Sequence, residues 1–151
     1  SRFVAAATAF LVPGGRIVFS VRVPGLGMRL STLVEDPALR ERISEAEKTF
    51  FSDTDNPLFS WNGPILQKTL TAPERSVHCE TIEMIEPRRP SPQDIERWFD
   101  PEHSPYGAML HAKLHDNDVQ TFRRTLEQRF AAGPADWQFC TVLCTVTREQ
   151  R

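Results

Sequence analysis

The sequence predicts a single α/β domain, and three observations carry this prediction. Two segments, Arg16 to Val23 and Trp137 to Val146, are almost continuously apolar and rich in β-branched or aromatic residues, as strands inside a sheet are. Between them, apolar residues recur three or four positions apart, most clearly from Val119 to Phe130. The 151 residues, 40% hydrophobic and 25% charged, suit one domain that can bury a sizeable core. We therefore expect three strands and about six helices.

The chain opens with an apolar segment, a tight turn and the first strand. Phe3 to Phe10 has almost no polar face, which predicts a helix laid against a sheet. Leu11 to Gly15 contains a Pro-Gly pair, which supplies a fixed φ and then a positive φ, so the chain should reverse there. Arg16 to Val23 follows as a strand that we expect to be buried on both faces.

The loop after this strand, Pro24 to Arg29, contains half of a dinucleotide-binding fingerprint. Its Gly-x-Gly follows a strand, but Leu30 stands where the third glycine should be. No acidic residue ends a second strand about 20 residues further on. A flexible loop on the active-site side of the sheet is the better interpretation.

Two helices are predicted next from their start signals. Asp36 is placed as an N-cap before Pro37, and a helix ending near Phe51 follows, with one apolar stripe and a solvated opposite face. The stripe comprises Leu39, Ile43, Ala46 and Phe50, and the solvated face comprises Arg40, Glu41, Glu45 and Lys48. Gly63-Pro64 opens a short helix with a packing face. That face comprises Ile65, Leu66, Thr69 and Leu70.

The two remaining strands differ in charge. Ser76 to Glu86 interleaves its apolar residues with His and Glu, which favours the edge of a sheet, where charge discourages further pairing. Trp137 to Val146 is apolar on both faces and belongs inside the sheet. We therefore expect Trp137 to Val146 to lie between Ser76 to Glu86 and Arg16 to Val23.

Three more helices are expected between these strands. Ser91-Pro92 starts one, with Asp94 as the acidic member of a capping box. A short helix spans about Tyr106 to Leu114. Asp116 or Asp118 then caps a longer helix, which Gly133-Pro134 stops.

Composition narrows the functional classes. A net charge of −2 argues against direct nucleic-acid binding, since such domains carry a strong basic excess. The apolar stretches break within about a dozen residues, short of the roughly 20 that a spanning helix needs, so no membrane association is expected. Three cysteines make no metal spacing and no even disulfide set, which indicates the cytoplasm.

Several residues suggest chemistry, and each also has a plainer interpretation. His111 and His115 could share a helix face as zinc ligands, but the H-E-x-x-H pattern is absent, and a surface pair is favoured. Cys140 and Cys144 point the same way on a strand at about 13 Å, beyond disulfide reach, and are expected in the core. Two arginine groups could touch phosphate, yet acidic neighbours favour a solvated surface. These groups are Arg88-Arg89 and Arg123-Arg124 with Arg129. We expect no metal site.

The segment L-V-P-G-G-R-I-V-F-S-V resembles the one that enters the fifth strand of class I S-adenosylmethionine-dependent methyltransferases. From Leu11 onward the chain is also similar to a methyltransferase-like C-terminal domain fused to AAA+ ATPases of the RarA/MgsA recombination-factor type in cyanobacterial-type proteins. The landmarks of this second resemblance are I-S-E-A-E-K-x-F-F-S-D, N-P-L-F-S-W, E-R-W-F, S-P-Y and W-Q-F-C-T-V-L-C-T-V.

These resemblances imply the C-terminal half of a Rossmann-like sheet, with the last strand antiparallel and central. The chain has no initiator Met and begins inside a predicted helix, so we expect a single partial domain over residues 1–151. In that family the cofactor pocket is formed by the glycine-rich loop after the first strand and residues near the second and fourth. No position here matches those motifs, so we name no catalytic or cofactor-binding residue. The resemblance implies S-adenosylmethionine as a cofactor for the complete domain, and we expect none in this chain.

Two functions from different classes remain open at this point. In one, the parent domain is an active methyltransferase, and Pro24 to Arg29 with the following helix shapes the acceptor pocket. In the other, it is a catalytically silent module that docks to, or oligomerises, a recombination or replication ATPase. The chain alone is expected to be inactive and to bind neither S-adenosylmethionine nor ATP. Its partners should be the upstream half of its own domain or a second copy, through the unpaired edge of Arg16 to Val23.

Overall fold

The computed structural model describes residues 6–7 and 9–149, and these residues form two compact units. The first, which we call the sheet unit, comprises the described residues up to Leu26, then Thr54–Met84 and the residues from Phe139 onward. The second, the helical unit, comprises Gly27–Asp53 and Ile85–Gln138. Half of the predicted helix from Phe3 to Phe10 lies outside the described residues, and residues 6, 7 and 9 are helical.

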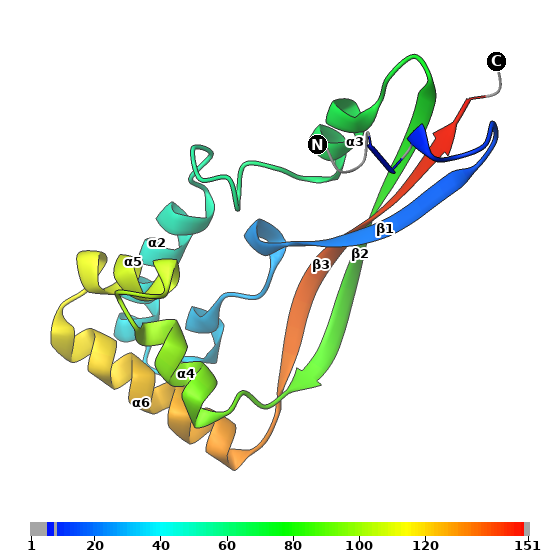
Figure 1. Cartoon of the computed structure of the whole chain (residues 1–151). Helices are drawn as coiled ribbons and strands as arrows, with labels where there is room; N and C mark the ends of the chain where they lie inside the picture. Colours follow the sequence, from blue (N-terminus) through cyan, green and yellow to red (C-terminus); the bar gives the residue numbers. More distant parts are fainter. Residues whose placement is uncertain (1–5, 8, 150–151) are drawn as a thin grey trace. The chain divides into compact units, whose positions relative to one another are not determined.

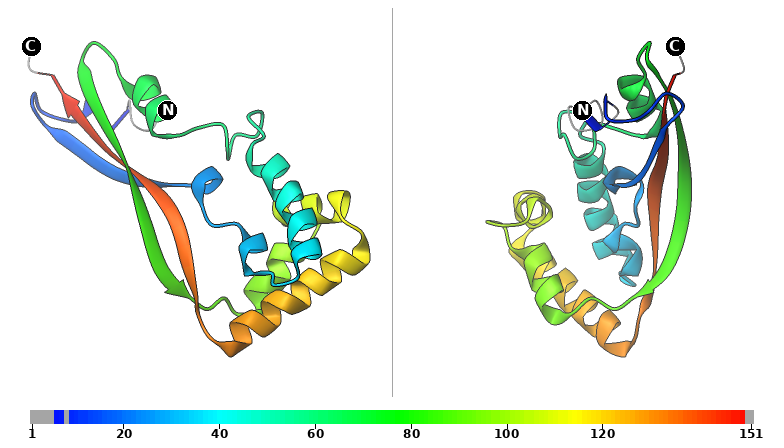
Figure 2. Two further views of the ribbon diagram at one scale, coloured as in Figure 1. Left: turned by 180° about the vertical axis from the view of Figure 1, so that it is seen from behind. Right: turned by 45° about the vertical axis from the view of Figure 1, so that its right-hand side comes forward.

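The three strands have the predicted order. The sheet runs β1 (Arg16–Val23), β3 (Ala135–Arg148), β2 (Arg75–Arg88), so β3 is central. β1 and β3 are antiparallel, from Arg16 opposite Thr147 to Val23 opposite Cys140. Figures 1 and 2 show β3, in orange to red, between the blue and green strands, with the arrowheads of β2 and β3 at opposite ends. The prediction that the last strand separates the other two is confirmed, as is its antiparallel direction.

The turn before β1 forms as its Pro-Gly pair predicts. The N–H of Gly15 donates to the C=O of Val12 at 2.8 Å, and Gly14 has a φ of 77°, which glycine adopts without a steric cost. Gly14 and Gly15 are also hydrogen-bonded to Arg148, at 2.9 and 3.0 Å. The turn is therefore fastened to the end of β3.

β1 is not buried on both faces, and that prediction is wrong. Its side chains alternate between half-buried and exposed, and Val18 is 60% exposed. The apolar run of β1 predicts a covered strand, but burial needs a layer on each face. Within the described residues, nothing covers the face that carries Val18.

The rest of the sheet unit has two small cores. Leu70, Val77 and Val146 form one, and a second gathers on β3 and the end of β1. The second consists of Val23, Cys140, Val142 and Cys144. α3 (Gly63–Leu70) begins at Asn62, whose Oδ1 accepts from the N–H of Ile65 at 3.0 Å. The predicted packing face of α3 is only partly correct, because Ile65 is exposed.

The predicted loop from Pro24 to Arg29 begins with a short 3-10 helix, Pro24–Leu26 (η1). A second 3-10 helix, Leu30–Leu33 (η2), follows the loop. α2 (Pro37–Phe51) then begins as predicted, with Asp36 Oδ1 accepting from the N–H of Leu39 at 2.8 Å. Its apolar stripe is buried as predicted, with Phe50 half-buried.

Three further helices complete the helical unit. α4 (Pro92–Phe99) has the complete capping box between Ser91 and Asp94. α5 spans Pro105–Lys113 and α6 spans Asp116–Ala132. The N-cap of α6 is His115, without a side-chain cap, so the prediction that an aspartate caps α6 is wrong. Asp116 and Asp118 lie instead in the first turn of α6, where their negative charge interacts favourably with the helix dipole.

One large core holds the helical unit together. It buries residues from η2, all four α-helices of the unit and the start of β3. Its fully buried side chains include Ile43, Leu110, Phe122 and Leu126. Phe99 and Phe122 meet edge to face with ring centroids 5.3 Å apart, a geometry that aromatic pairs prefer. Packing in this unit is therefore continuous across its helices.

Candidate functional site

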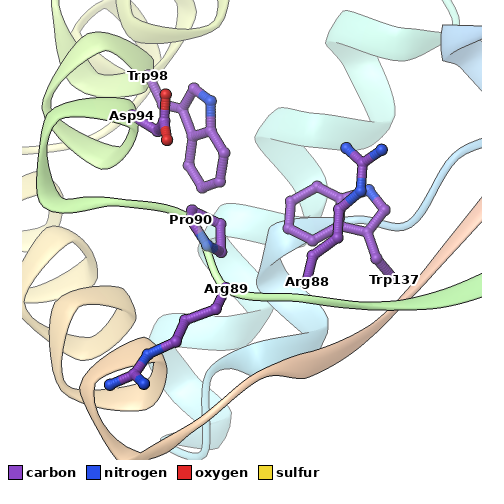
Figure 3. Close-up of a pocket in the computed structure, with 6 residues that line it drawn as sticks. All are labelled: Arg88, Arg89, Pro90, Asp94, Trp98 and Trp137. Carbon is purple, nitrogen blue, oxygen red and sulfur yellow. The ribbon is translucent and has the colours of Figure 1, made fainter.

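A hollow of about 380 Å³ opens in the helical unit where β2 ends and α4 begins. Figure 3 shows the side chains that line it, which are Arg88, Arg89, Pro90, Asp94, Trp98 and Trp137. Local sequence explains why they converge. Pro90 directs the chain from β2 into the capping box, and Asp94 and Trp98 are four residues apart on α4, hence on one helical face. Trp137 comes from the start of β3.

Aromatic rings form the wall of this hollow. The centroids of Trp98 and Trp137 are 5.7 Å apart, with the rings tilted by 46°. Phe130 lies behind both, at 6.5 Å from Trp98 and 6.4 Å from Trp137. Such rings offer wide, stiff surfaces for contact with apolar or flat groups.

The charged groups at the hollow are engaged with the protein. The carboxylate of Asp94 accepts from the N–H and the hydroxyl of Ser91, at 3.0 and 2.7 Å, and pairs with Arg97. The Ser91 bonds come first among the causes that lower the pKa of Asp94. This carboxylate therefore stays ionised and serves the start of α4, rather than acting as an acid or base.

The two arginines have separate roles. Arg89 donates to the C=O groups of Phe130 and Ala131, at 3.0 and 2.9 Å, and so satisfies the carbonyl end of α6. Arg88 pairs with Glu86, and its guanidinium carbon is 5.9 Å from the centre of the Trp137 ring. The arginine pair is thus part of the architecture around the hollow. The arrangement can bind a group against ring faces, and its one carboxylate, Asp94, is held by Ser91 and Arg97.

A second polar group in the helical unit is centred on Glu47, which is 1% exposed. Oε1 of Glu47 accepts from the N–H of Leu30 at 3.0 Å and from the hydroxyl of Tyr106 at 2.6 Å. Oε2 accepts from the N–H and hydroxyl of Ser31, at 3.3 and 2.5 Å. A buried carboxylate is tolerated only when it is paired in this way. Through these hydrogen bonds, Glu47 of α2 connects η2 and α5.

The electrostatics of this group indicate a structural role rather than proton transfer. Burial, followed by the nearby charge of Glu47, raises the pKa of Tyr106 well above its ordinary value. The hydroxyl therefore stays protonated and keeps donating. Arg29 stands beside it, with its guanidinium 3.8 Å from the ring centre of Phe51, and burial lowers the pKa of Arg29.

Sequence reasoning missed Glu47, although a signal was present. Glu47 is four residues after Ile43 and directly follows Ala46, so it lies on the apolar stripe of α2, away from the solvated face. A charged residue on a buried stripe indicates a paired charge in the core. The identity of its partners could not be read from local spacing, since Tyr106 is far along the chain.

Of the two histidines singled out in the sequence, His111 has a carboxylate neighbour and His115 is the N-cap of α6, while His103 has a carboxylate neighbour of its own. Nδ1 of His111 is 3.8 Å from Asp116, and Nδ1 of His103 is 2.8 Å from Asp100. In the part of the chain that the structure describes, no group of three or more His, Cys, Asp or Glu side chains could hold a metal ion.

The remaining candidates are structural. Arg123 pairs with Glu127 at 2.9 Å, and Arg129 donates to the C=O groups of Gly133 and Pro134. Cys140 and Cys144 are buried, as the sequence predicts.

No protein-family model matches this sequence, and a search of the curated proteins finds no significant match. Among the helices that the structure describes, none is long and apolar enough to span a membrane.

Proposed function

We propose that this chain is the C-terminal portion of a S-adenosylmethionine-dependent methyltransferase-like domain. One observation carries the proposal: the last strand, β3, enters antiparallel between β1 and β2. Consecutive strands are usually neighbours, and crossover-linked strands of doubly wound sheets are parallel. A final strand that reverses and inserts between two earlier ones is therefore a specific topological feature. It is the one that the resembled family has in its fifth, seventh and sixth strands.

The position of the resembled segment also supports the proposal. Its Pro-Gly-Gly turn leads directly into β1, which would be the fifth strand of the complete domain. β1 lies at the edge of the sheet, and its apolar Val18 is exposed. An edge of this composition is what a fourth strand and its helix would cover.

The proposed role of this portion is to complete the sheet and to cover the substrate side. Methyl transfer needs the sulfonium methyl held in line with the acceptor, so its chemistry is mainly positioning. The residues from Pro24 to Arg29 and α2 would contribute to the acceptor side. Cofactor contacts would come from the upstream half. The parent protein would also carry the AAA+ ATPase that the second resemblance implies, in the cytoplasm.

A non-catalytic module of that ATPase is the second candidate. One observation favours it: the charged side chains at the ring-lined hollow are all engaged in helix caps and ion pairs. A hollow of this kind is suited to holding a partner's side chain and unsuited to acid-base chemistry.

Calorimetry separates these candidates. The 151-residue chain should show no saturable binding of S-adenosylmethionine or ATP, because it has no phosphate or ribose cradle. The protein extended upstream in its own gene should bind S-adenosylmethionine if the domain is an enzyme. If the extended protein binds the ATPase but not the cofactor, the result supports the second candidate, a non-catalytic module. Saturable micromolar binding by the 151-residue chain alone would overturn the proposal that it is the C-terminal half.

A further inference from the structure

The three cysteines lie in the sheet unit and differ in exposure. Cys79 is half-buried on the edge strand β2, whereas Cys140 and Cys144 are buried on the central strand β3. Cys79 packs against the small core that contains Cys144. One accessible thiol therefore lies beside a protected one.

Two contacts fix how β2 and β3 face each other. The N–H of Glu149 donates to the C=O of Glu74 at 3.0 Å. A Cβ built on Gly63 would meet both Thr81 Oγ1 and Val142 Cγ2, at 3.1 and 3.6 Å. Both contacts fit one antiparallel register. If Glu74 lies opposite Glu149, then seven residues further along β2 and seven residues back along β3, Thr81 lies opposite Val142.

The same register places Cys79 directly opposite Cys144. Antiparallel pairs alternate between hydrogen-bonded and non-hydrogen-bonded, and counting from Glu74 puts Cys79 at a non-hydrogen-bonded position. Its backbone N–H agrees, because it turns away from β3 and donates to Gln67 Oε1 at 3.1 Å. Non-hydrogen-bonded partners have Cα atoms about 4.5 Å apart, within the range of about 4.4–6.8 Å that a disulfide spans. The Cys79 side chain is also among the causes that raise the pKa of the Cys144 thiol, as expected for neighbouring groups.

Only one of these thiols is open to a reagent. Cys79 lines a hollow of about 480 Å³ together with Pro64, Gln67, Lys68 and Thr71. Cys144 is 0% exposed, and burial, followed by interaction with Cys79, raises its pKa far above the ordinary value. A soluble oxidant therefore reaches Cys79 first, and Cys144 reacts only with what forms on Cys79.

We propose that Cys79 and Cys144 are a redox-active pair in which a hydroperoxide oxidises Cys79 and Cys144 then closes a disulfide between β2 and β3. In the first step the Cys79 sulfur attacks the peroxide oxygen, the O–O bond breaks, and Cys79 becomes a sulfenic acid as water or alcohol leaves. In the second step the Cys144 sulfur attacks the Cys79 sulfur. The S–O bond breaks, the departing hydroxide takes the Cys144 proton, and water leaves. This inference does not depend on the proposed function.

The disulfide would join the two strands that lead into and out of the helical unit. Between Cys79 and Cys144 lies the whole segment Ile85–Gln138. The bond therefore ties the edge strand to the central strand regardless of whether the helical unit is folded. A crosslink that closes so long a loop stabilises by restricting the unfolded chain.

Peptide mass spectrometry after treatment with hydrogen peroxide tests the pair. The expected product is one Cys79–Cys144 crosslink, lighter by two hydrogen atoms and reversed by dithiothreitol. Cys140→Ser is the matched control and should form the same crosslink, since Cys140 is buried and hydrogen-bonded to the C=O of Leu26. A crosslink that uses Cys140, or oxidation of Cys79 to sulfinic acid with no crosslink in the Cys140→Ser protein, would overturn the proposal.

Single substitutions separate the two steps. In Cys144→Ser, Cys79 should accumulate as a sulfenic acid that dimedone labels. In Cys79→Ser, Cys144 should stay unlabelled, because peroxide cannot reach it. Equal dimedone labelling of Cys144 in Cys79→Ser would contradict the assigned order. Circular dichroism of each variant before oxidation confirms that it is folded, so a missing crosslink is then attributable to the chemistry.

Discussion

The helical unit and the sheet unit bury their apolar side chains to different extents. The helical unit has one large core, and even its buried carboxylate, Glu47, has a full set of hydrogen-bond donors. The sheet unit has two small cores and carries nearly all of the large apolar side chains that are exposed among the described residues. These are Phe10, Val12, Val18, Leu26, Leu58, Ile65, Ile82 and Met84, with only Ile85 in the helical unit.

The two units therefore differ in how much apolar surface they leave uncovered. A soluble surface tolerates single apolar side chains, but a concentration of them in one unit indicates a surface made for contact. The helical unit has side-chain caps at the starts of α2, α4 and α5, and it has one continuous core. The sheet unit lacks a cover for one face of β1 within the described residues, which is the expectation for the proposed half-sheet.

The largest effect should come from the helical core. Leu126→Ala removes a side chain that is 0% exposed and should lower the free energy of unfolding by about 2–5 kcal/mol, through lost burial and the cavity left behind. Leu58→Ala, the matched change in the sheet unit, should cost about 0.5 kcal/mol or less, because Leu58 is exposed. Urea unfolding followed by fluorescence and circular dichroism measures both. Equal losses in the free energy of unfolding would contradict the expected difference between the two units.

A smaller effect on stability should follow from removing one hydrogen bond to the buried carboxylate of Glu47. Tyr106→Phe removes the hydroxyl that donates to Oε1 and should lower the free energy of unfolding by about 1–3 kcal/mol, since a buried carboxylate loses one donor. Thr49→Ala removes an exposed hydroxyl from α2 and should be nearly neutral. Urea unfolding of both variants is the measurement. If Tyr106→Phe leaves the free energy of unfolding unchanged, the remaining donors are sufficient to stabilise the Glu47 carboxylate.

The capping box of α4 should give a modest, pH-dependent effect. The pKa of Asp94 is lowered from its ordinary 3.8, first by the Ser91 bonds, so its contribution is present above about pH 4 and is lost as pH falls through the folded-state pKa. Ser91→Ala should cost about 1 kcal/mol at pH 7 and less at pH 2–3. Thermal unfolding across this pH range checks it. A cost that does not change with pH would show that Asp94 has no part in the cap's stability.

The smallest effect on stability should come from β1, where association is the informative quantity. The chain should self-associate through the unpaired edge of Arg16–Val23, and Val18→Lys should weaken this association while changing stability by about 0.5 kcal/mol or less. Thr49→Lys places the same charge in the helical unit and should leave association unchanged. Light scattering, with hydrogen exchange of residues 16–23, provides the measurement. A monomer with a fully protected β1 would mean that the sheet is complete without an upstream half.

The local structure of this protein could be predicted from its sequence. The turn at Gly14, the caps at Asp36 and Ser91 and the apolar period of α6 all form as predicted, because each depends on residues within one turn of one another. The strand order was also within reach, since charge on β2 and the apolar faces of β3 distinguish an edge from a centre.

Contacts between side chains far apart in the sequence could not be predicted in the same way. The ring-lined hollow, the partners of Glu47 and the pairing of Cys79 with Cys144 join residues far apart in sequence, and no local spacing specifies them. Exposure of Val18 was likewise beyond a sequence prediction, because an apolar run records a strand's suitability for burial and not the presence of a covering layer.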